Sequence, residues 1–288
     1  MRMKQKISFL LGFLLLLDYG FVAAQDNPNR EDWIRLFNGK DLTGWIPKIK
    51  GFKAGENFIN TFRVEGGILK ADTRDYDSFN NHFGHLFYVR PFSYYKIRVE
   101  YRFFEPQAKN GPRWAAENSG IMIHCQPPET MGINQDFPIS IEVQLLADDG
   151  SGNRPDANVC TPGTNIVMHD SLITQHCVTS TAKTHKPGEW TTVEAVVLGG
   201  SLIEHYVNGE KVLSYTMPQV GGEVVNDYYD WAKPDGKLLT GGYISLQSES
   251  QPVEFRKVEL LNLEGCMDPK AKNYKSYYVK DDRCSCVY

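Results

Sequence analysis

Several common patterns are missing from this chain of 288 residues. It has no Cys-x-x-Cys pair and no His-Glu-x-x-His segment, which argues against a zinc site of the usual kinds. It has neither a long amphipathic helical pattern nor a repeat of fixed period, which leaves short strands as the main source of structure. Its formal net charge is −4, so it lacks the positive charge that favours binding to nucleic acid, and we expect no nucleic-acid partner.

The first 24 residues have the layout of a secretory signal peptide. Three basic residues precede an apolar run over residues 7–17, and small residues end the segment at Ala24. The run is too short for a comfortable membrane span, and no cysteine follows it that would support a lipid anchor. We therefore expect cleavage near Ala24 and a secreted or periplasmic protein. Losing three positive charges and one negative charge changes the formal net charge from −4 to −6.

The rest of the chain is patterned as short strands. The 25 glycines, 15 prolines and 12% aromatic residues of the whole chain suit strands separated by turns, and Asn208-Gly209 is a favoured hairpin turn. We predict an all-β antiparallel sandwich or jelly roll over residues 25–263, followed by a short tail over residues 264–288. The predicted strands are Lys96–Phe104, Gly120–Gln126, Ile139–Leu146, Thr191–Leu198, Leu202–Val207, Lys211–Tyr215, Gly242–Ser248 and Val253–Leu261.

Six cysteines fit an exported protein, because disulfides persist in oxidising compartments. Cys160 and Cys177 bracket a loop rich in Gly, Asn and Thr, and we predict a disulfide between them. In the tail, Cys266 is expected to pair with Cys284 or, as the alternative, with Cys286. Either bond would hold together a segment that has little else to pack.

Three of the predicted strands carry polar side chains at every second position. Because side chains alternate between the faces of a strand, Glu142 and Gln144 share one face of residues 139–146, opposite an apolar face. The same alternation groups Met122, His124 and Gln126 on a second strand, and Tyr243, Ser245, Gln247 and Glu249 on a third. If these strands are neighbours, one concave sheet presents a histidine and two carboxylates as an acid–base constellation. Taken singly, each face is equally typical of a solvated sheet.

The alternation has one vulnerable position. It places Cys125 on the core side of its strand beside Ile121 and Ile123, as a buried free thiol rather than a nucleophile. It places His124 on the other side. A β-bulge between Ser119 and Gln126 would turn His124 inward instead.

Three stretches are longer than tight turns, namely Glu105–Ser119, Ala147–His176 and Gln219–Gly241. Long loops in a compact domain are often functional. The exposed ring faces of loop aromatics suit sugar rings, although a loop tryptophan can equally cover the core. The predicted substrate-binding residues are Arg113, Trp114, Trp231 and Tyr243.

A succession of short motifs runs through this region. In chain order these are Leu36 to Trp45 (LFNGKDLTGW), Asn118 to Ile121 (NSGI), Glu142 to Leu145 (EVQL), Pro187 to Trp190 (PGEW), Val207 to Gly209 (VNG), Ser245 to Glu249 (SLQSE) and Pro252 to Arg256 (PVEFR). The ordered set covers roughly Arg35 to Leu263 and resembles the 3-keto-disaccharide hydrolase domain family. The resemblance implies a concanavalin-like jelly roll of two curved sheets, related in shape to laminarinase-type glucanases, and an exported protein that acts on glycans.

The tail resembles a second, smaller motif. Gly265 to Tyr274 (GCMDPKAKNY), followed by Val279 to Cys284 (VKDDRC), is similar to a cysteine-bracketed tail repeat of secreted bacterial proteins. Its aspartates suggest calcium, but three acidic side chains fall short of the usual six to eight oxygen ligands. A solvated turn held by a disulfide is the favoured interpretation.

The resemblance also implies a mechanism. Laminarinase-type strands carry Glu-x-Asp-x-x-Glu, whereas the matching stretch here begins at Glu142 and ends at Ala147, so the second glutamate is missing unless Glu249 replaces it. A 3-keto sugar relaxes this requirement, because the ketone acidifies the C2 proton and one base then suffices for β-elimination, with water added afterwards.

Under this hypothesis Glu142 is the base. Gln144 and Gln247 donate hydrogen bonds to the developing enolate, and His124 assists proton transfer to the leaving oxygen. A divalent metal ion on His124, Glu142 or Glu249 is the alternative source of enolate stabilisation, and no other cofactor is expected.

The expected partner is a glycoside or oligosaccharide substrate. Two other functions fit the same fold: a carbohydrate-binding module without chemistry, and an ordinary β-glucan hydrolase. A protein-interaction or adhesin domain is a third, supported only by the tail. The sequence does not indicate an oligomeric state.

Overall fold

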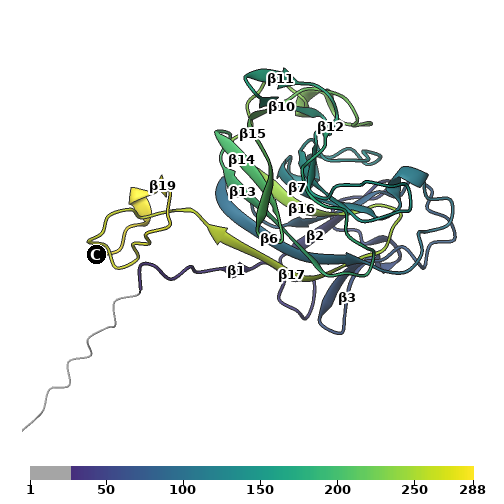
Figure 1. Cartoon of the computed structure of the whole chain (residues 1–288), viewed down its shortest axis with the longest axis horizontal. Helices are drawn as coiled ribbons and strands as arrows, with labels where there is room; N and C mark the ends of the chain where they lie inside the picture. Colours follow the sequence, from purple (N-terminus) through teal and green to yellow (C-terminus); the bar gives the residue numbers. More distant parts are fainter. Residues whose placement is uncertain (1–26) are drawn as a thin grey trace, which may run out of the picture.

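The computed structural model describes residues 27–288, and the predicted signal peptide at residues 1–24 lies outside them. The described residues form strands, loops and short 3-10 helices, with no α-helix in this range. None of their helices is long and apolar enough to cross a membrane. Two large curved sheets pack face to face (Figure 1), so the fold is the all-β jelly-roll sandwich that the sequence predicts.

The strands divide into two layers and a small tail sheet. The ten-stranded sheet has the order β11 (Ser171–Ile173), β10 (Thr164–Met168), β15 (Glu210–Val220), β14 (Leu202–Val207), β13 (Thr191–Leu198), β6 (Tyr94–Phe103), β17 (Val253–Asn262), β4 (Ile68–Ala71) and β3 (Phe62–Glu65), with β1 (Ile34–Arg35) paired to β17. The seven-stranded sheet has the order β12 (Cys177–Val178), β9 (Asn158–Cys160), β8 (Ile141–Leu146), β7 (Asn118–Cys125), β16 (Tyr243–Ser248), β5 (Gly84–Tyr88) and β2 (Trp45–Ile49). In the tail, β18 (Glu264–Gly265) and β19 (Lys280–Asp281) pair in parallel. The 3-10 helices are η1 (Phe58–Asn60), η2 (Arg113–Ala115), η3 (Pro128–Thr130), η4 (Asp230–Ala232) and η5 (Arg283–Ser285).

The core lies between the two large sheets because strands of both layers alternate. In β6 every second side chain from Tyr95 to Phe103 is buried, while the intervening ones are only partly covered. From the other layer Ile141, Val143 and Leu145 of β8 enter the same core. All eight predicted strands are present: β13 and β14 have the predicted ends, the other six have shifted ends, and β15 continues to Val220. The predicted hairpin turn is also confirmed, because Asn208 and Gly209 both have the positive φ that a type I′ turn requires.

Two disulfides form among the described residues. The bond predicted between Cys160 and Cys177 is confirmed, and it joins directly opposite residues of β9 and β12. In the tail Cys266 bonds to Cys286, so the pairing with Cys284 is wrong. The reason is the turn η5, which Asp282 caps by accepting a hydrogen bond from the Cys284 backbone N–H. Cys284 stays on this turn as an exposed free thiol, and the chain brings Cys286 to Cys266.

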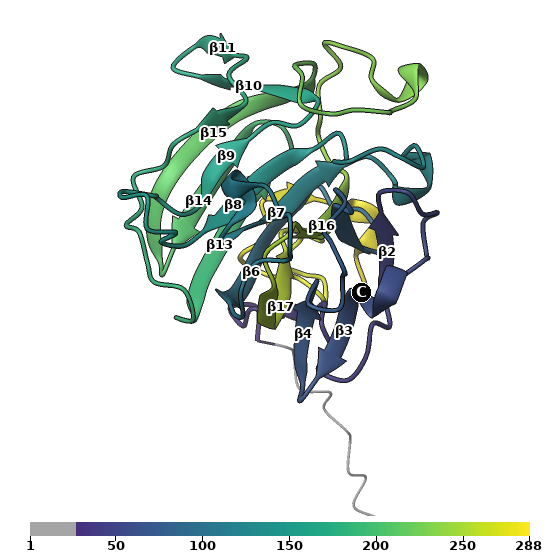
Figure 2. The same ribbon diagram turned by 90° about the vertical axis from the view of Figure 1, so that its right-hand side faces the viewer.

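The seven-stranded sheet has one face on the core and one face under the long loops. The view in Figure 2 shows β7, β8 and β9 side by side. Residues of the loops at 81–83, 112–114, 136–137 and 224–226 line a cavity over the second face. The polar side chains of that face therefore form the floor of the candidate site.

Candidate functional site

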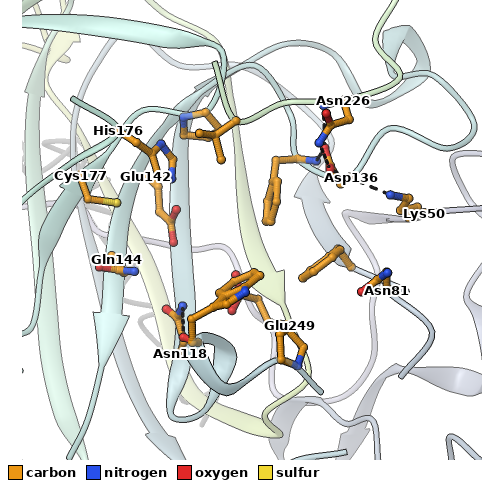
Figure 3. Close-up of a pocket in the computed structure, with 16 residues that line it drawn as sticks. Lys50, Asn81, Asn118, Asp136, Glu142, Gln144, His176, Cys177, Asn226 and Glu249 are labelled. Atoms are coloured by element: carbon orange, nitrogen blue, oxygen red, sulfur yellow. Dashed lines mark hydrogen bonds and ion pairs between the residues drawn. The ribbon is translucent and has the colours of Figure 1, made fainter. Parts of the chain in front are cut away.

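The cavity has a volume of about 580 Å³ and is lined from both the sheet and the loops (Figure 3). Glu142 and Gln144 reach it from β8, because their neighbours Ile141, Val143 and Leu145 are committed to the core. The other labelled polar residues around it are Lys50, Asn81, Asn118, Asp136, His176, Asn226 and Glu249. The structure thus brings Glu142, Gln144 and Glu249 of the predicted catalytic set into one cavity.

The register of the strands explains how the carboxyl group of Glu142 fits. Glu142 lies opposite Met122 of β7 and opposite Cys160 of β9, and Gln144 lies opposite Gly120. A Cβ atom on Gly120 would come within 2.6 Å of Glu142 Oε1 and 2.8 Å of its Cγ. Because glycine has no side chain, the Glu142 side chain lies across Gly120 and over the middle of the sheet.

Many polar atoms around this cavity are buried without a hydrogen-bond partner in the protein. Such atoms are uncommon in folded proteins, and a cluster of them is typical of a site that a polar ligand or water completes. Four of them belong to residues that line the cavity: Glu142 Oε1, Glu249 Oε2, Asn118 Oδ1 and His176 Nδ1. Both ring nitrogens of His85 and both side-chain amide atoms of Gln247 are unpartnered as well, on paired residues of β5 and β16 that do not line the cavity. A sugar, with a hydroxyl group on most of its carbons, suits this set of donors and acceptors.

The two carboxyl groups have strongly perturbed acidities. Burial raises the pKa of Glu142 to about 8. Burial also raises the pKa of Glu249 well above its usual range, and the nearby Glu142 charge raises it further while Arg154 opposes the shift. Two coupled carboxyl groups with raised pKa values in one cavity are a suitable pair for moving protons near neutral pH.

Gln247 lies deeper on the same face than the cavity lining. It is fully buried and sits opposite His85 of β5, which in turn sits opposite Lys48 of β2. Burial, with the Lys48 charge, lowers the pKa of His85 to about 3, so its imidazole is neutral. Lys48 Nζ donates to the backbone oxygens of Ile49 and Ile133, which ties the loop above the face to the sheet.

One wall of the cavity is aromatic. Trp114, in η2, is 54% exposed, and its ring stacks on Phe83 at 5.9 Å between centroids. Its backbone oxygen accepts from Asn118 Nδ2 at 3.3 Å. Arg113 is exposed on the same turn and does not line the cavity. Trp114 can therefore present a ring face to a bound sugar, whereas Arg113 lies outside.

The opposite wall depends on a contact between two loops. Asp136 accepts hydrogen bonds from the backbone N–H and the side-chain amide of Asn226, at 2.9 and 2.7 Å. Lys50 Nζ lies 4.0 Å from the same carboxylate. The loop between β15 and β16 is thereby fixed against the loop between β7 and β8.

The prediction that His124 shares this cavity is wrong. Between β7 and β16 the register changes from Met122 opposite Ser245 to Cys125 opposite Tyr243, which inserts one extra residue into β7. His124 takes up this bulge with a φ of 52°. Its Nε2 lies 3.1 Å from the backbone oxygen of Gly199, in the turn between β13 and β14 of the ten-stranded sheet.

The same bulge reverses the neighbouring cysteine. Cys125 remains a buried free thiol, as predicted, but it does not pack beside Ile121 and Ile123. It packs with Met122 and Phe87 on the opposite face of the sheet. Burial raises its pKa to about 12, which keeps the thiol protonated and unreactive.

Trp231 and Tyr243 line a different cavity of about 430 Å³, together with His124. Trp231, in η4, is 67% exposed and stacks on Tyr229 at 5.8 Å. Neither residue is part of the lining around Glu142. The structure thus separates two of the predicted substrate-binding residues from the predicted base.

Of the three alternative metal ligands, the structure brings Glu142 and Glu249 into one cavity and places His124 in another. His124 projects away from Glu142 and Glu249, so the three do not converge on one ion. Among residues 27–288 the one group with converging ligand atoms is Cys160, His176 and Cys177. Its two sulfur atoms are joined in a disulfide and are not available as thiolates.

Sequence reasoning missed His85, Asn118 and His176. In the sequence Asn118 stands out only as part of a family motif, although a strand start next to a long loop is a common place for a functional side chain. His85 lies in a strand that was not predicted. His176 had one signal, its position next to a cysteine expected to form a disulfide.

Residues 32–261 match the profile of a protein family described as the 3-keto-alpha-glucoside-1,2-lyase-like domain. Two solved structures from Parabacteroides distasonis, both described as proposed glycosyl hydrolases, resemble the chain. One is 18% identical, covers 81% of this chain and 100% of its own, and has a TM-score of 0.49. The other is 22% identical, covers 80% and 94%, and has a TM-score of 0.48.

A Bacillus licheniformis β-glucanase is 12% identical, covers 82% of this chain and 100% of its own, and has a TM-score of 0.46. At these identities and scores, none of the three likenesses assigns an activity to this chain. No curated protein sequence matches it.

Proposed function

The chain belongs to the 3-keto-alpha-glucoside-1,2-lyase-like domain family, and from this premise we propose that it is an enzyme that cleaves glycosides oxidised to a ketone at C3. The family description names elimination across C1 and C2 of such a sugar. The observation that carries the proposal is the pair of buried carboxyl groups, Glu142 and Glu249, each with an unpartnered oxygen in one cavity.

The first step is deprotonation at C2. The C3 ketone delocalises the negative charge that forms at C2, so a single carboxylate can remove this proton. Glu142 takes the proton, and the electron pair of the C2–H bond forms an enolate. Its pKa of about 8 makes it a stronger base than an ordinary carboxylate, while a fraction stays ionised at neutral pH. Gln144, which lines the cavity, is the proposed donor to the enolate oxygen, whereas Gln247 is buried beneath the lining and is not assigned this role.

The second step is departure of the aglycone. The enolate electrons form the C1=C2 double bond, and the C1–O bond breaks with its electron pair on the aglycone oxygen. That oxygen requires a proton, and Glu249 is the proposed donor, because its raised pKa keeps it protonated. Glu249 thus replaces His124 in this role. Addition of water, with hydroxyl at C1 and hydrogen at C2, would turn the elimination into net hydrolysis.

The remaining features support an exported enzyme for a sugar substrate. Trp114 is the proposed platform for a sugar ring at the cavity wall. The two disulfides are typical of oxidising compartments, which favours secretion after cleavage near Ala24. We propose residues 25–263 as the catalytic domain and residues 264–288 as a tail held by a disulfide.

The test compares the wild type with Glu142→Gln on a 3-keto-glucoside with a chromogenic aglycone. The variant should fold and bind sugar but release aglycone at least about a hundredfold more slowly, the usual scale for loss of a general base. Glutamine keeps the shape of the side chain but cannot accept the C2 proton. The matched control is the same glucoside without the C3 ketone, which neither form should cleave.

Two outcomes would replace the proposal. Cleavage of the unoxidised glucoside by the wild type would favour an ordinary glycosidase that uses Glu142 and Glu249 as its two carboxyl groups. Binding of both sugars without turnover, with or without added divalent metal ions, would favour a carbohydrate-binding module.

A further inference from the structure

His176 lies at the cavity wall beside the proposed base and has no established role. Figure 3 shows its ring and the Glu142 carboxylate in the same part of the cavity. Its Nδ1 is buried and has no hydrogen-bond partner in the protein. Burial lowers the pKa of this imidazole, so the ring is neutral and offers one N–H donor and one acceptor nitrogen.

The strand register explains why His176 lies so close to Glu142. Glu142 is directly opposite Cys160, and Cys160 is directly opposite Cys177 in the edge strand β12. Glu142, Cys160 and Cys177 therefore form one row across β8, β9 and β12. His176 directly precedes Cys177 in the sequence. A ring nitrogen of His176 lies within 4.8 Å of both sulfur atoms of the disulfide.

The backbone of His176 is held from both sides. Its oxygen accepts hydrogen bonds from the Thr161 backbone N–H at 2.8 Å and from the Thr161 hydroxyl at 3.1 Å. On its other side the chain is joined to β9 through the disulfide of Cys177, with 4.1 Å between the two Cα atoms. The strand β12 has two residues and lies at the edge of its sheet, so ladder hydrogen bonds alone give it little support.

We propose that His176 is a catalytic residue that hydrogen-bonds the sugar next to the carbon deprotonated by Glu142, and that the disulfide between Cys160 and Cys177 positions it. This inference rests on the proposed function. It assigns the disulfide a role in activity as well as in stability: reduction releases β12, and the imidazole then loses its fixed place opposite the substrate. The buried residues of the sandwich core include neither His176 nor Cys177, and Val178 is the one residue of β12 that packs against them, so the core persists.

The experiment measures kcat and KM on a 3-keto-glucoside for four proteins: the wild type, His176→Ala, the pair Cys160→Ser with Cys177→Ser, and the combination of all three changes. We expect each of the first two changes to lower kcat/KM by about 10- to 100-fold, the scale for loss of a hydrogen bond in a buried site. The combination should be hardly worse than the cysteine pair, because His176 acts only when the disulfide holds it. His176→Asn, which keeps a polar group near the Nδ1 position, should recover part of the loss.

The matched control removes the other disulfide. The pair Cys266→Ser with Cys286→Ser deletes a bridge in the tail, which Figure 1 shows apart from the two large sheets. It should leave kcat/KM unchanged. Thermal unfolding of every variant, with assays well below its midpoint, separates a loss of activity from a loss of fold.

Several results would overturn the inference. A wild type that turns over the substrate together with a fully active His176→Ala variant would reject His176 and leave the proposed function intact. If His176→Ala lowers kcat/KM by the same factor with and without the disulfide, the positioning role is rejected. If the wild type shows no turnover, the proposed function fails, and calorimetric binding of methyl 3-keto-α-glucoside still tests the contact: unchanged affinity in His176→Ala would reject it.

Discussion

Gly120 lies directly beneath the side chain of Glu142, and a Cβ atom at Gly120 would meet Glu142 Oε1 at 2.6 Å. Gly120 does not have the positive φ that only glycine adopts easily, so its backbone conformation does not require glycine. What the position requires is the absence of a side chain. The strand β7, which carries Gly120, therefore leaves space for the side chain of the proposed base, Glu142.

Gly120→Ala should lower the activity of the enzyme without unfolding it. The added methyl group pushes the end of a flexible side chain and not the backbone, so the Glu142 carboxyl group moves and the sheet adapts. We expect kcat on a 3-keto-glucoside to fall about tenfold or more, because a displacement of about 1 Å can cost that much in rate. The circular dichroism spectrum should match that of the wild type.

The control for this prediction is the Glu142→Gln background. If Gly120→Ala acts by moving the carboxylate, it should cost little further activity once that carboxylate is gone. An equally large loss in both backgrounds would mean that the methyl group disturbs something other than Glu142.

The rate should increase with pH up to about 8. The proposed base must be ionised, and burial raises the pKa of Glu142 to about 8. Below that value kcat/KM should increase by roughly tenfold per pH unit, and above it the rate should level off while Glu249 remains protonated. A pH profile of kcat/KM between 5 and 10 checks this. A plateau that starts near pH 5 would show that the base is a carboxylate with an ordinary pKa, exposed to solvent.

The stability of the folded protein should decrease as the pH rises, whereas the rate increases. Glu142 has a folded-state pKa of about 8, above its usual 4.5, so its favourable contribution is complete below about 4.5 and is lost as the pH rises through about 8. Glutamine does not titrate. Glu142→Gln should therefore gain unfolding free energy relative to the wild type, by up to about 1.4 kcal/mol per pH unit over this interval.

Urea unfolding of both proteins at pH 5 and at pH 8 measures this difference. The variant should have the larger advantage at pH 8. An advantage of the same size at both values would mean that Glu142 is not buried as an acid in the folded protein.

Much of the fold follows from local alternation, because each strand with one face on the core must place apolar residues at every second position. β8 obeys this rule along its whole length, so Glu142 and Gln144 could be assigned to one face from the sequence. β7 breaks it at His124, where one extra residue with positive φ changes the face of every later side chain. Nothing in the letters around His124 marks this position, since the bulge depends on how β7 pairs with a strand more than 100 residues away.

Loops are harder to predict for a related reason. Trp114 and Trp231 look equivalent in the sequence, as tryptophans in long polar loops. Which cavity each one reaches depends on long-range contacts, such as the hydrogen bonds of Asn226 to Asp136 and the stacking of Trp114 on Phe83. These contacts join residues that no local pattern connects.

The two tryptophans should therefore respond differently to the same substitution. Trp114→Ala removes an aromatic ring from the wall of the cavity that contains Glu142. It should raise KM for a small 3-keto-glucoside by about 5- to 30-fold, on the scale of a stacking contact worth roughly 1–2 kcal/mol. Trp231→Ala removes a more exposed ring from a cavity that does not contain Glu142, so KM should stay within about twofold of the wild type. The two variants control for each other, because each replaces an exposed tryptophan that stacks on one neighbouring ring. If both changes raise KM for the small substrate equally, the two cavities act as one binding site. Trp231 would then contact the same substrate as the proposed base, Glu142.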